Sequence, residues 1–162
     1  MSIRDGIRRV VIGVGNQYRR DDGFGHLVVT ELAEQQRCDA GLATVELRAS
    51  DGEPTGMLEL WAGADLVVVV DAVRDGGDHA GHRYELVLDD LDGLAEDRAA
   101  SSHGISLGST VALGRALDRL PRRLIVLAVA GDEFGFGLGL TPPVAAAVRP
   151  VVQRVRELLS QP

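Results

Sequence analysis

The sequence predicts an α/β fold: a single three-layer α/β/α domain in which a mostly parallel, twisted sheet of about five strands is flanked by helices. Two runs, 64–73 (ADLVVVVDAV) and 122–131 (RRLIVLAVAG), are largely apolar and do not alternate with polar residues. Such runs are typical of parallel strands buried on both faces. Segments with helical periodicity separate the expected strands, which favours helices on both faces of the sheet. The 162 residues fit one domain that spans 1–162.

Three further strands complete the expected sheet. The run RRVVIGVG (8–15) is short and rich in β-branched residues, with charge before it and glycine at its end, which predicts a buried strand. The segment ATVELR (43–48) alternates apolar and polar residues, as a half-buried strand does. The segment RYELVL (83–88) follows a loop rich in glycine, and we expect it at an edge of the sheet.

Helices are expected between and after these strands. Apolar residues recur at helical spacing from Gly23 to about Gln36; 55–63 is expected to form a short helix and 103–120 a longer one. Thr141 can cap a last helix, because Pro142 suits its first turn. That helix would have one apolar face, formed by Val144, Val148, Val151, Val152, Val155, Leu158 and Leu159.

The composition excludes several classes of protein. The net charge of −7 argues against a partner surface of nucleic acid or anionic membrane. Cys38 is the only cysteine, so the chain has neither a disulfide framework nor a CxxC site. Charged residues at positions 4, 5, 8 and 9 interrupt any signal peptide, and the apolar run 66–70 is far too short to span a membrane. We therefore expect a cytoplasmic protein, and a monomer is the simplest expectation.

The segment 10–25 (VVIGVGNQYRRDDGFG) places a glycine-rich turn between a strand and a helix, as nucleotide-binding folds do. However, Tyr18 replaces the third glycine of a G-x-G-x-x-G motif, and Asp21 and Asp22 lie where a helix N-terminus favours an anionic ligand. A Rossmann-like nucleotide-binding module is therefore kept only as an alternative. Asp22 suits the N-cap of the helix, but two adjacent acids exceed the need of one cap, so a second function for one of them is an equal alternative.

Ligands of open α/β sheets bind beyond the carboxyl ends of the strands. In chain order, the residues expected there are Gly13, Gly15, Asn16, Asp21, Asp22, Asp51, Gly52, Asp71, Gly131, Asp132 and Glu133. Asp71 directly follows an apolar run, where a carboxylate is costly to bury unless it is paired or bound to a metal ion. Capping of a helix or loop is the alternative for Asp71.

His103 begins the expected helix in SSHGISLG. A lone histidine is more often structural than a ligand. Together with Asp22 and Asp71, however, it would form an open site for a borderline divalent metal ion such as nickel or zinc, with positions left for substrate or water. No spacing motif joins the three residues, so this hypothesis depends on their residue types and on their expected places in the fold.

Other candidate sites carry weaker signals. The loop 75–82 (DGGDHAGH) contains Asp75, Asp78, His79 and His82 and is a conceivable second metal site, but its glycine content favours a solvated loop. Cys38 has no histidine nearby in the sequence. Ser102 is adjacent to His103 rather than opposite it, and the chain has no GxSxG elbow. The sequence thus offers no activated nucleophile.

Several blocks of the sequence resemble those of the hydrogenase maturation endopeptidases, which trim the large-subunit precursor of nickel–iron hydrogenases. The first, IGVGNQYRRDDGFG, is similar to the family's G-x-G-N and D-[DE]-G-x-G pattern, and DGEPTGML is similar to its D-G-G-T-x-G loop. VVVVDAV, SSHGISLGSTVAL and LGLTPPVAAAVRPVV follow in family order. The resemblance spans nearly the whole chain and implies the same α/β fold that the periodicity predicts.

The resemblance also implies a substrate and a site. The substrate would be a hydrogenase large-subunit precursor with nickel already inserted, from which the enzyme removes a C-terminal peptide. Asp22, Asp71 and His103 correspond to the family's metal-binding residues, and they would contact nickel supplied by the substrate. No tightly bound cofactor is then expected. A metal-binding protein without catalysis is a further alternative.

Gly15, Asn16, Asp51 and Gly52 are the expected substrate-binding residues, since the glycine-lined turn could approach a substrate's backbone closely. The sequence departs from the family at a few positions. Asp22 stands where some members have glutamate, and Glu53 and Pro54 stand where glycine and threonine are usual. These last two departures alter the loop beside Asp51.

Overall fold

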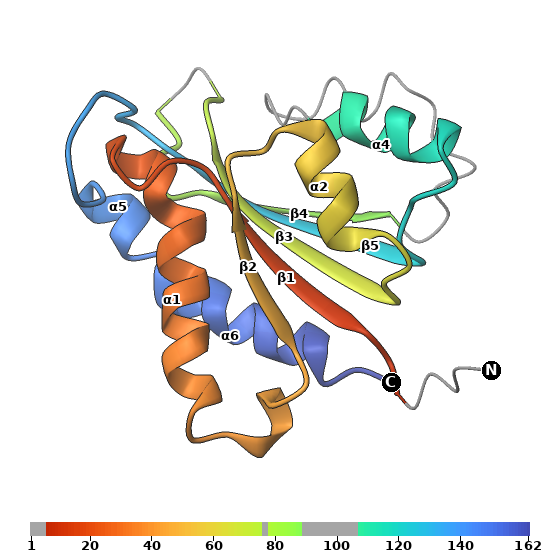
Figure 1. Cartoon of the computed structure of the whole chain (residues 1–162). Helices are drawn as coiled ribbons and strands as arrows, with labels where there is room; N and C mark the ends of the chain where they lie inside the picture. The colour runs from red at the N-terminus through yellow and green to blue at the C-terminus, as the bar shows by residue number, and fades with distance from the viewer. Residues whose placement is uncertain (1–5, 76–77, 89–106) are drawn as a thin grey trace.

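The computed structural model describes residues 6–75, 78–88 and 107–162. Within them, a five-stranded sheet has the order β2-β1-β3-β5-β4 (Figure 1). The strands are β1 (Arg9–Val14), β2 (Glu46–Ser50), β3 (Leu66–Val73), β4 (Arg83–Leu88) and β5 (Arg123–Ala130). β4 lies at an edge and pairs antiparallel with β5, whereas the other pairings are parallel. The predicted fold class and the edge position of 83–88 are confirmed.

Helices cover both faces of the sheet (Figure 1). The first helix, α1 (Phe24–Gln36), packs with α6 (Val148–Leu159) over one face, and α2 (Pro54–Trp61) packs with α4 (Leu107–Ala116) over the other. The short helices η1 (Arg20–Gly23), η2 (Ala40–Leu42) and α5 (Pro142–Ala145) complete the described elements. Within the described residues, no helix is long and apolar enough to cross a membrane.

The apolar run of β3 is explained by this layering. Val68 and Val70 belong to the core beneath α1 and α6, whereas Val67 and Val69 belong to the core beneath α2 and α4. All four side chains are fully buried. Each contributes about 1.5–3 kcal/mol to folding, so both faces of the strand must be apolar.

The predicted last helix is divided in two. It was expected to run on from Thr141, but α5 ends at Ala145 and α6 begins at Val148. Pro150 explains the break, because it has no backbone N–H to donate to the carbonyl of Ala146 and its ring would crowd that carbonyl. In the first turn of α6 the missing N–H costs little. Thr141 precedes α5, but its side chain makes no capping hydrogen bond.

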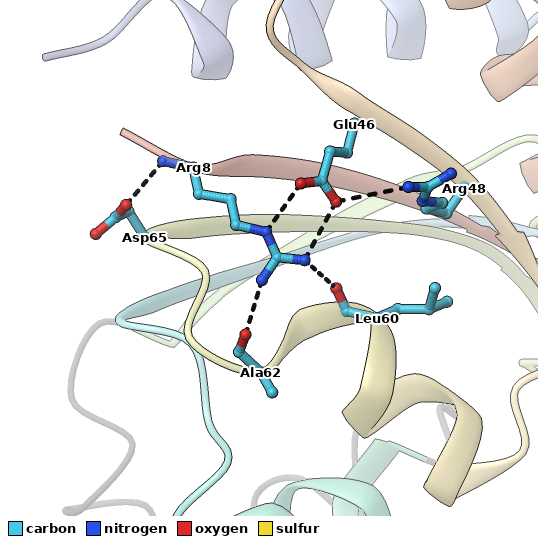
Figure 2. Close-up of polar contacts among 6 residues, drawn as sticks. All are labelled: Arg8, Glu46, Arg48, Leu60, Ala62 and Asp65. Atoms are coloured by element: carbon cyan, nitrogen blue, oxygen red, sulfur yellow. Dashed lines mark hydrogen bonds and ion pairs between the residues drawn. The ribbon is translucent and has the colours of Figure 1, made fainter. Parts of the chain in front are cut away.

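Arg8 ties together the amino ends of the strands (Figure 2). Its guanidinium binds both carboxylate oxygens of Glu46 in β2, at 2.9 and 3.2 Å, and donates to the carbonyls of Leu60 and Ala62 at the end of α2. Its backbone N–H donates to Asp65, ahead of β3. The hydrogen bond from Arg8 lowers the pKa of Glu46. This cluster stabilises the end of the sheet that is opposite the expected site.

Candidate functional site

A pocket of about 360 Å³ lies beyond the carboxyl ends of the central strands. It is lined by Val14, Gly15, Arg19, Asp22, Asp51, Gly52, Asp71, Ala72, Val73, Arg74 and Phe134. The pocket therefore brings together five of the residues expected from the sequence. Asn16 adjoins them without lining the pocket, and its backbone N–H donates to Asp22. The gathering follows from topology, because β1, β2 and β3 are parallel and end at one edge.

A larger hollow of about 640 Å³ lies between β4 and α6. Its principal charged groups are already paired, since Arg154 binds Glu85 at 2.8 Å and Glu157 at 3.1 Å. Of the candidate site residues named from the sequence, only His82 lines it. The smaller pocket is therefore the better candidate for chemistry.

Asp71 lies within β3, opposite Ala128 of β5. Its carboxylate accepts a hydrogen bond from the backbone N–H of Ala72 at 2.8 Å. Burial raises the pKa of Asp71 to about 7; the Ala72 hydrogen bond opposes this shift, and the negative charge of Asp22 adds to it. Asp71 lies in a strand and begins no helix, so of the alternative that it caps a helix or a loop, the helix cap is wrong. A carboxyl group that titrates near neutrality in a pocket is typical of functional sites.

Asp22 lies in η1, and its Oδ2 accepts the backbone N–H of Asn16 at 2.9 Å. The carboxylate thus turns back over the loop after β1. The N-cap of α1 is Gly23, and no side chain caps that helix, so the alternative that Asp22 serves as its N-cap is wrong. Asp22 is partly exposed in the pocket, where its charge acts on Asp71.

Gly15 is needed for this arrangement. Its φ is +130°, and a Cβ atom there would lie 2.0 Å from the Asp22 carbonyl oxygen. Any side chain would force the turn apart. The Gly15 carbonyl accepts a hydrogen bond from the His26 ring at 2.8 Å, and its N–H donates to the Ser50 carbonyl at 3.0 Å. The close approach that glycine permits here is therefore to the chain's own backbone.

Asp21 has a different role from its neighbour Asp22. It is fully buried, and its carboxylate accepts the backbone N–H groups of Asp132, Glu133 and Thr141 and the Thr141 hydroxyl. Burial favours the neutral form, but these hydrogen bonds outweigh it and lower the pKa of Asp21. Asp21 joins the first loop to the loop after β5 and is structural. The Thr141 hydroxyl donates to Asp21 and does not cap the N-terminus of α5.

The departures from the family pattern at positions 53 and 54 have a local explanation. Glu53 is the N-cap of α2, and its carboxylate accepts the N–H groups of Thr55 and Gly56 at 3.0 and 2.9 Å. Pro54 occupies the first helical position, which suits proline. Asp51 accepts the N–H of Glu53 at 3.0 Å and is exposed. These hydrogen bonds fix the conformation of the loop, and Asp51 lines the pocket.

Three pocket residues with a charged or aromatic side chain were missed by the sequence analysis. The guanidinium of Arg74 lies 4.6 Å from the centre of the Phe134 ring. Arg19 donates from Nε to the Phe134 carbonyl at 3.0 Å. The ring also explains Gly131, because a Cβ atom there would lie 2.5 Å from Phe134 Cζ. These residues form a wall that we call the arginine wall: Arg19, Arg74 and Phe134.

His103, together with Ser101 and Ser102, lies outside the described residues. Its position relative to Asp22 and Asp71 stays a prediction. In the described ranges, no group of three or more His, Cys, Asp or Glu side chains could hold a metal ion. Cys38 is an exposed free thiol.

The expectation of a solvated loop at 75–82 is only partly right. The Asp75 side chain is buried, accepts a hydrogen bond from the Tyr84 hydroxyl at 2.8 Å and lies 3.3 Å from Nδ1 of His79. The His79 side chain is largely exposed. The loop is thus fixed to β4 through Asp75, and its histidines belong to no metal-binding group within the part of the chain that the structure describes.

Comparison with known proteins gives the family. The sequence model of the HycI family, described as hydrogenase maturation protease, matches residues 28–158. The chain belongs to this family. It is therefore a peptidase of the hydrogenase maturation type, and the resemblance seen in the sequence is confirmed. Family membership disfavours both the nucleotide-binding module and the non-catalytic metal-binding protein.

Individual relatives agree with this family assignment. The hydrogenase expression/formation protein HoxM of Azotobacter vinelandii is 29% identical, over 94% of this chain and 72% of its own. The hydrogenase 2 maturation protease of Escherichia coli is 24% identical, over 96% of this chain and 92% of its own.

Solved structures show the same fold. The hydrogenase-maturating endopeptidase HybD from E. coli has a TM-score of 0.71 at 24% identity, over 94% of this chain and 92% of its own. The maturation protease HycI from Thermococcus kodakarensis has a TM-score of 0.63 at 23% identity, over 98% of this chain and 96% of its own.

Proposed function

We propose that this peptidase removes the C-terminal peptide of a hydrogenase large-subunit precursor that already carries nickel, and that Asp22, Asp71 and His103 contact that nickel. The observation that carries the proposal is the pair of carboxylates in one pocket, with the pKa of Asp71 raised to about 7 by burial and by the charge of Asp22. A cation between the two would favour the charged form of both. The pocket is therefore suited to a positively charged centre.

The metal in this proposal belongs to the substrate. Two carboxylates and one imidazole leave coordination positions open, and nickel accepts both imidazole and oxygen ligands. A substrate that supplies the remaining ligands would bind tightly, whereas free nickel would bind weakly. The enzyme itself then needs no tightly bound cofactor, and it would distinguish a loaded precursor from an empty one.

A protein substrate also accounts for the apolar side chains beside the pocket. Tyr18, Phe136 and Leu138 are 59%, 93% and 74% exposed, and we call them the apolar rim. Gly137 donates its N–H to the Tyr18 carbonyl at 2.9 Å, so the two loops that carry the rim are joined. The same loops carry Arg19 and Phe134 of the pocket. Clustered exposed apolar side chains favour contact with another protein, here the precursor.

The test is to incubate the protein with nickel-loaded and nickel-free precursor and to follow loss of the C-terminal peptide by mass spectrometry. We expect processing of the loaded precursor only. Equal processing of both forms would contradict recognition of nickel, and processing of neither would contradict the proposed substrate. Cytoplasmic location and a monomeric state belong to the same proposal, and size-exclusion chromatography with light scattering tests the second.

A further inference from the structure

The arginine wall stands beside the carboxylates of the pocket without pairing with them. Arg19 and Arg74 line the same pocket as Asp22, Asp51 and Asp71. Ion pairs within 4.0 Å are formed by Arg8, Arg20, Arg37, Arg48, Arg122, Arg154 and Arg156. Within the described residues, no such pair involves Arg19 or Arg74. The pocket thus keeps its positive and negative groups apart.

The guanidinium of Arg74 contacts an aromatic ring, and within the part of the chain that the structure describes its N–H groups form no hydrogen bond or ion pair. Its guanidinium carbon lies over the Phe134 ring, 4.6 Å from the ring centre, and this cation–π contact holds arginine without using a carboxylate partner. Phe134 is fixed in turn by Arg19, which donates to its carbonyl, and by the lack of a side chain at Gly131. Ordering Arg74 in advance reduces the entropy cost of binding a ligand.

We propose that the arginine wall is a carboxylate-binding subsite that takes an acidic group of the precursor's C-terminal segment. This proposal rests on the proposed function. It adds that the substrate carries an acidic group near its C-terminus, which the pair Asp22 and Asp71 does not specify. The planar guanidinium matches a carboxylate through two parallel hydrogen bonds. A phosphate fits less well, since it carries more negative charge and would lie close to three carboxylates in a chain of net charge −7.

The carboxylate can come from an Asp or Glu side chain of the segment or from the end of the precursor chain. In either case it would hold the segment at the wall while the nickel lies at Asp22 and Asp71. The subsite therefore acts in positioning, and its loss should raise KM more than it lowers kcat.

The test uses the nickel-loaded precursor in three forms: unchanged, with the acidic side chains of the C-terminal segment replaced by amides, and with the chain end moved by two added neutral residues. Arg74→Gln should raise KM for the unchanged precursor about tenfold or more, as expected for a lost charge-assisted hydrogen bond. The KM of Arg74→Lys should lie between those of Arg74→Gln and the unchanged enzyme, because lysine keeps the charge but cannot form the two parallel hydrogen bonds. Phe134→Leu, which removes the ring but keeps Arg74, should raise KM by a smaller factor.

Arg122→Gln is the matched control. Arg122 is exposed, pairs with Asp65 at 3.7 Å and precedes β5 at the opposite end of the sheet, so its loss should leave KM unchanged. Urea midpoints of the arginine variants should agree with that of the unchanged protein, since the substituted arginines are exposed.

The double-mutant comparison identifies the ligand. If the wall binds an acidic side chain, the amide precursor has a raised KM with the unchanged enzyme and Arg74→Gln adds nothing more. If the wall binds the chain end, the extended precursor instead has a raised KM with the unchanged enzyme, and Arg74→Gln does not raise that KM further. An effect of Arg74→Gln that is the same for all three precursors, or no effect at all, would overturn the subsite. Failure of the unchanged enzyme to prefer loaded precursor would instead overturn the proposed function.

Discussion

Asp22 and Asp71 come from different elements, η1 and β3, and the charge of one acts on the other across the pocket. Burial is the larger cause that raises the pKa of Asp71 to about 7, and the charge of Asp22 adds to it. In the absence of a cation, the folded protein therefore resists ionisation of Asp71. Binding of a cationic centre would reverse this preference.

The first prediction is that Asp71→Asn stabilises the free protein while abolishing processing. Because the pKa of Asp71 is raised on folding, its ionisation lowers the free energy of unfolding as the pH rises from about 4 to about 7. Asparagine removes the charge, so at pH 8 the variant should be more stable by up to about 4 kcal/mol, because each unit of pKa shift corresponds to roughly 1.4 kcal/mol. At pH 4 the two proteins should agree. Urea midpoints at both pH values, with the processing rate on the same preparation, provide the measurement.

The same variant distinguishes a ligand from a structural residue. A nickel ligand that loses its charge should bind the substrate's metal weakly, so the processing rate should fall by two orders of magnitude or more, roughly what a lost charged contact at a reacting centre costs. Normal processing by a stably folded Asp71→Asn protein would show that Asp71 is not a ligand.

The second prediction concerns Asp21, whose pKa is shifted in the opposite direction. Since hydrogen bonds lower that pKa in the folded state, the carboxylate stabilises the protein at neutral pH, and this stabilisation is lost as the pH falls below about 4. Asp21→Asn should lower the free energy of unfolding at pH 7 by about 3 kcal/mol, because the amide cannot accept all four hydrogen bonds. Asp132→Asn, an exposed acid on the partner loop, is the control. An unchanged urea midpoint for Asp21→Asn would contradict the structural role.

The fold was predictable because its signals are local. The run 66–70 is apolar without alternation, and it forms a central strand with a core on each side. The break between α5 and α6 was missed, although Pro150 marks it, because the apolar spacing of 144–159 continues across the break. Periodicity records which face is buried and does not record whether the backbone is continuous.

The site was predictable as far as strand ends determine it. Gly15, Asp22 and Asp71 share a pocket because parallel strands end at one edge. The different roles of Asp21 and Asp22 depend on Thr141, which donates hydrogen bonds to Asp21 alone of the two. Thr141 is 120 residues from Asp21 in the sequence, and no sequence pattern links these two residues. Arg74 and Phe134 are likewise joined only in space, and loop residues of this kind have no periodic pattern.

The third prediction is that no covalent nucleophile is used. Cys38 is exposed, and the pocket lining does not include it; Ser102 lies outside the described residues. Cys38→Ala and Ser102→Ala should each retain most of the processing rate, within about threefold, as substitutions away from reacting groups do. A loss of several orders of magnitude in either variant, with an unchanged urea midpoint, would indicate covalent catalysis.

The fourth prediction concerns metal content. Because the protein offers few ligands, we expect little nickel after dialysis against a chelator, as measured by elemental analysis. A crystal soaked in a soft or borderline divalent ion should show anomalous density among Asp22, Asp71 and His103. Stoichiometric nickel that survives dialysis would contradict this expectation. Density only at His79 and His82 would place the metal site in the 75–82 loop instead.

The fifth prediction is that the apolar rim binds the body of the precursor. Phe136→Ser and Leu138→Ser remove large side chains that contact little in the free protein, so the urea midpoint should hardly change. If the rim is covered in the complex, each substitution should raise KM, by about tenfold for Phe136, because burying an aromatic side chain contributes roughly 1.5–3 kcal/mol. The value of kcat should be unchanged, since neither residue lines the pocket.

Leu117→Ser is the matched control for the rim. Leu117 is 52% exposed and follows α4, near the amino end of β5 and away from the pocket. The same loss of apolar surface there should leave KM unchanged. Equal effects of Leu117→Ser and Phe136→Ser on KM would mean that the precursor responds to general surface polarity, and the rim would then have no special role in docking. A selective effect of Phe136→Ser would place the precursor over the loops that hold Arg19 and Phe134, next to the carboxylate pair.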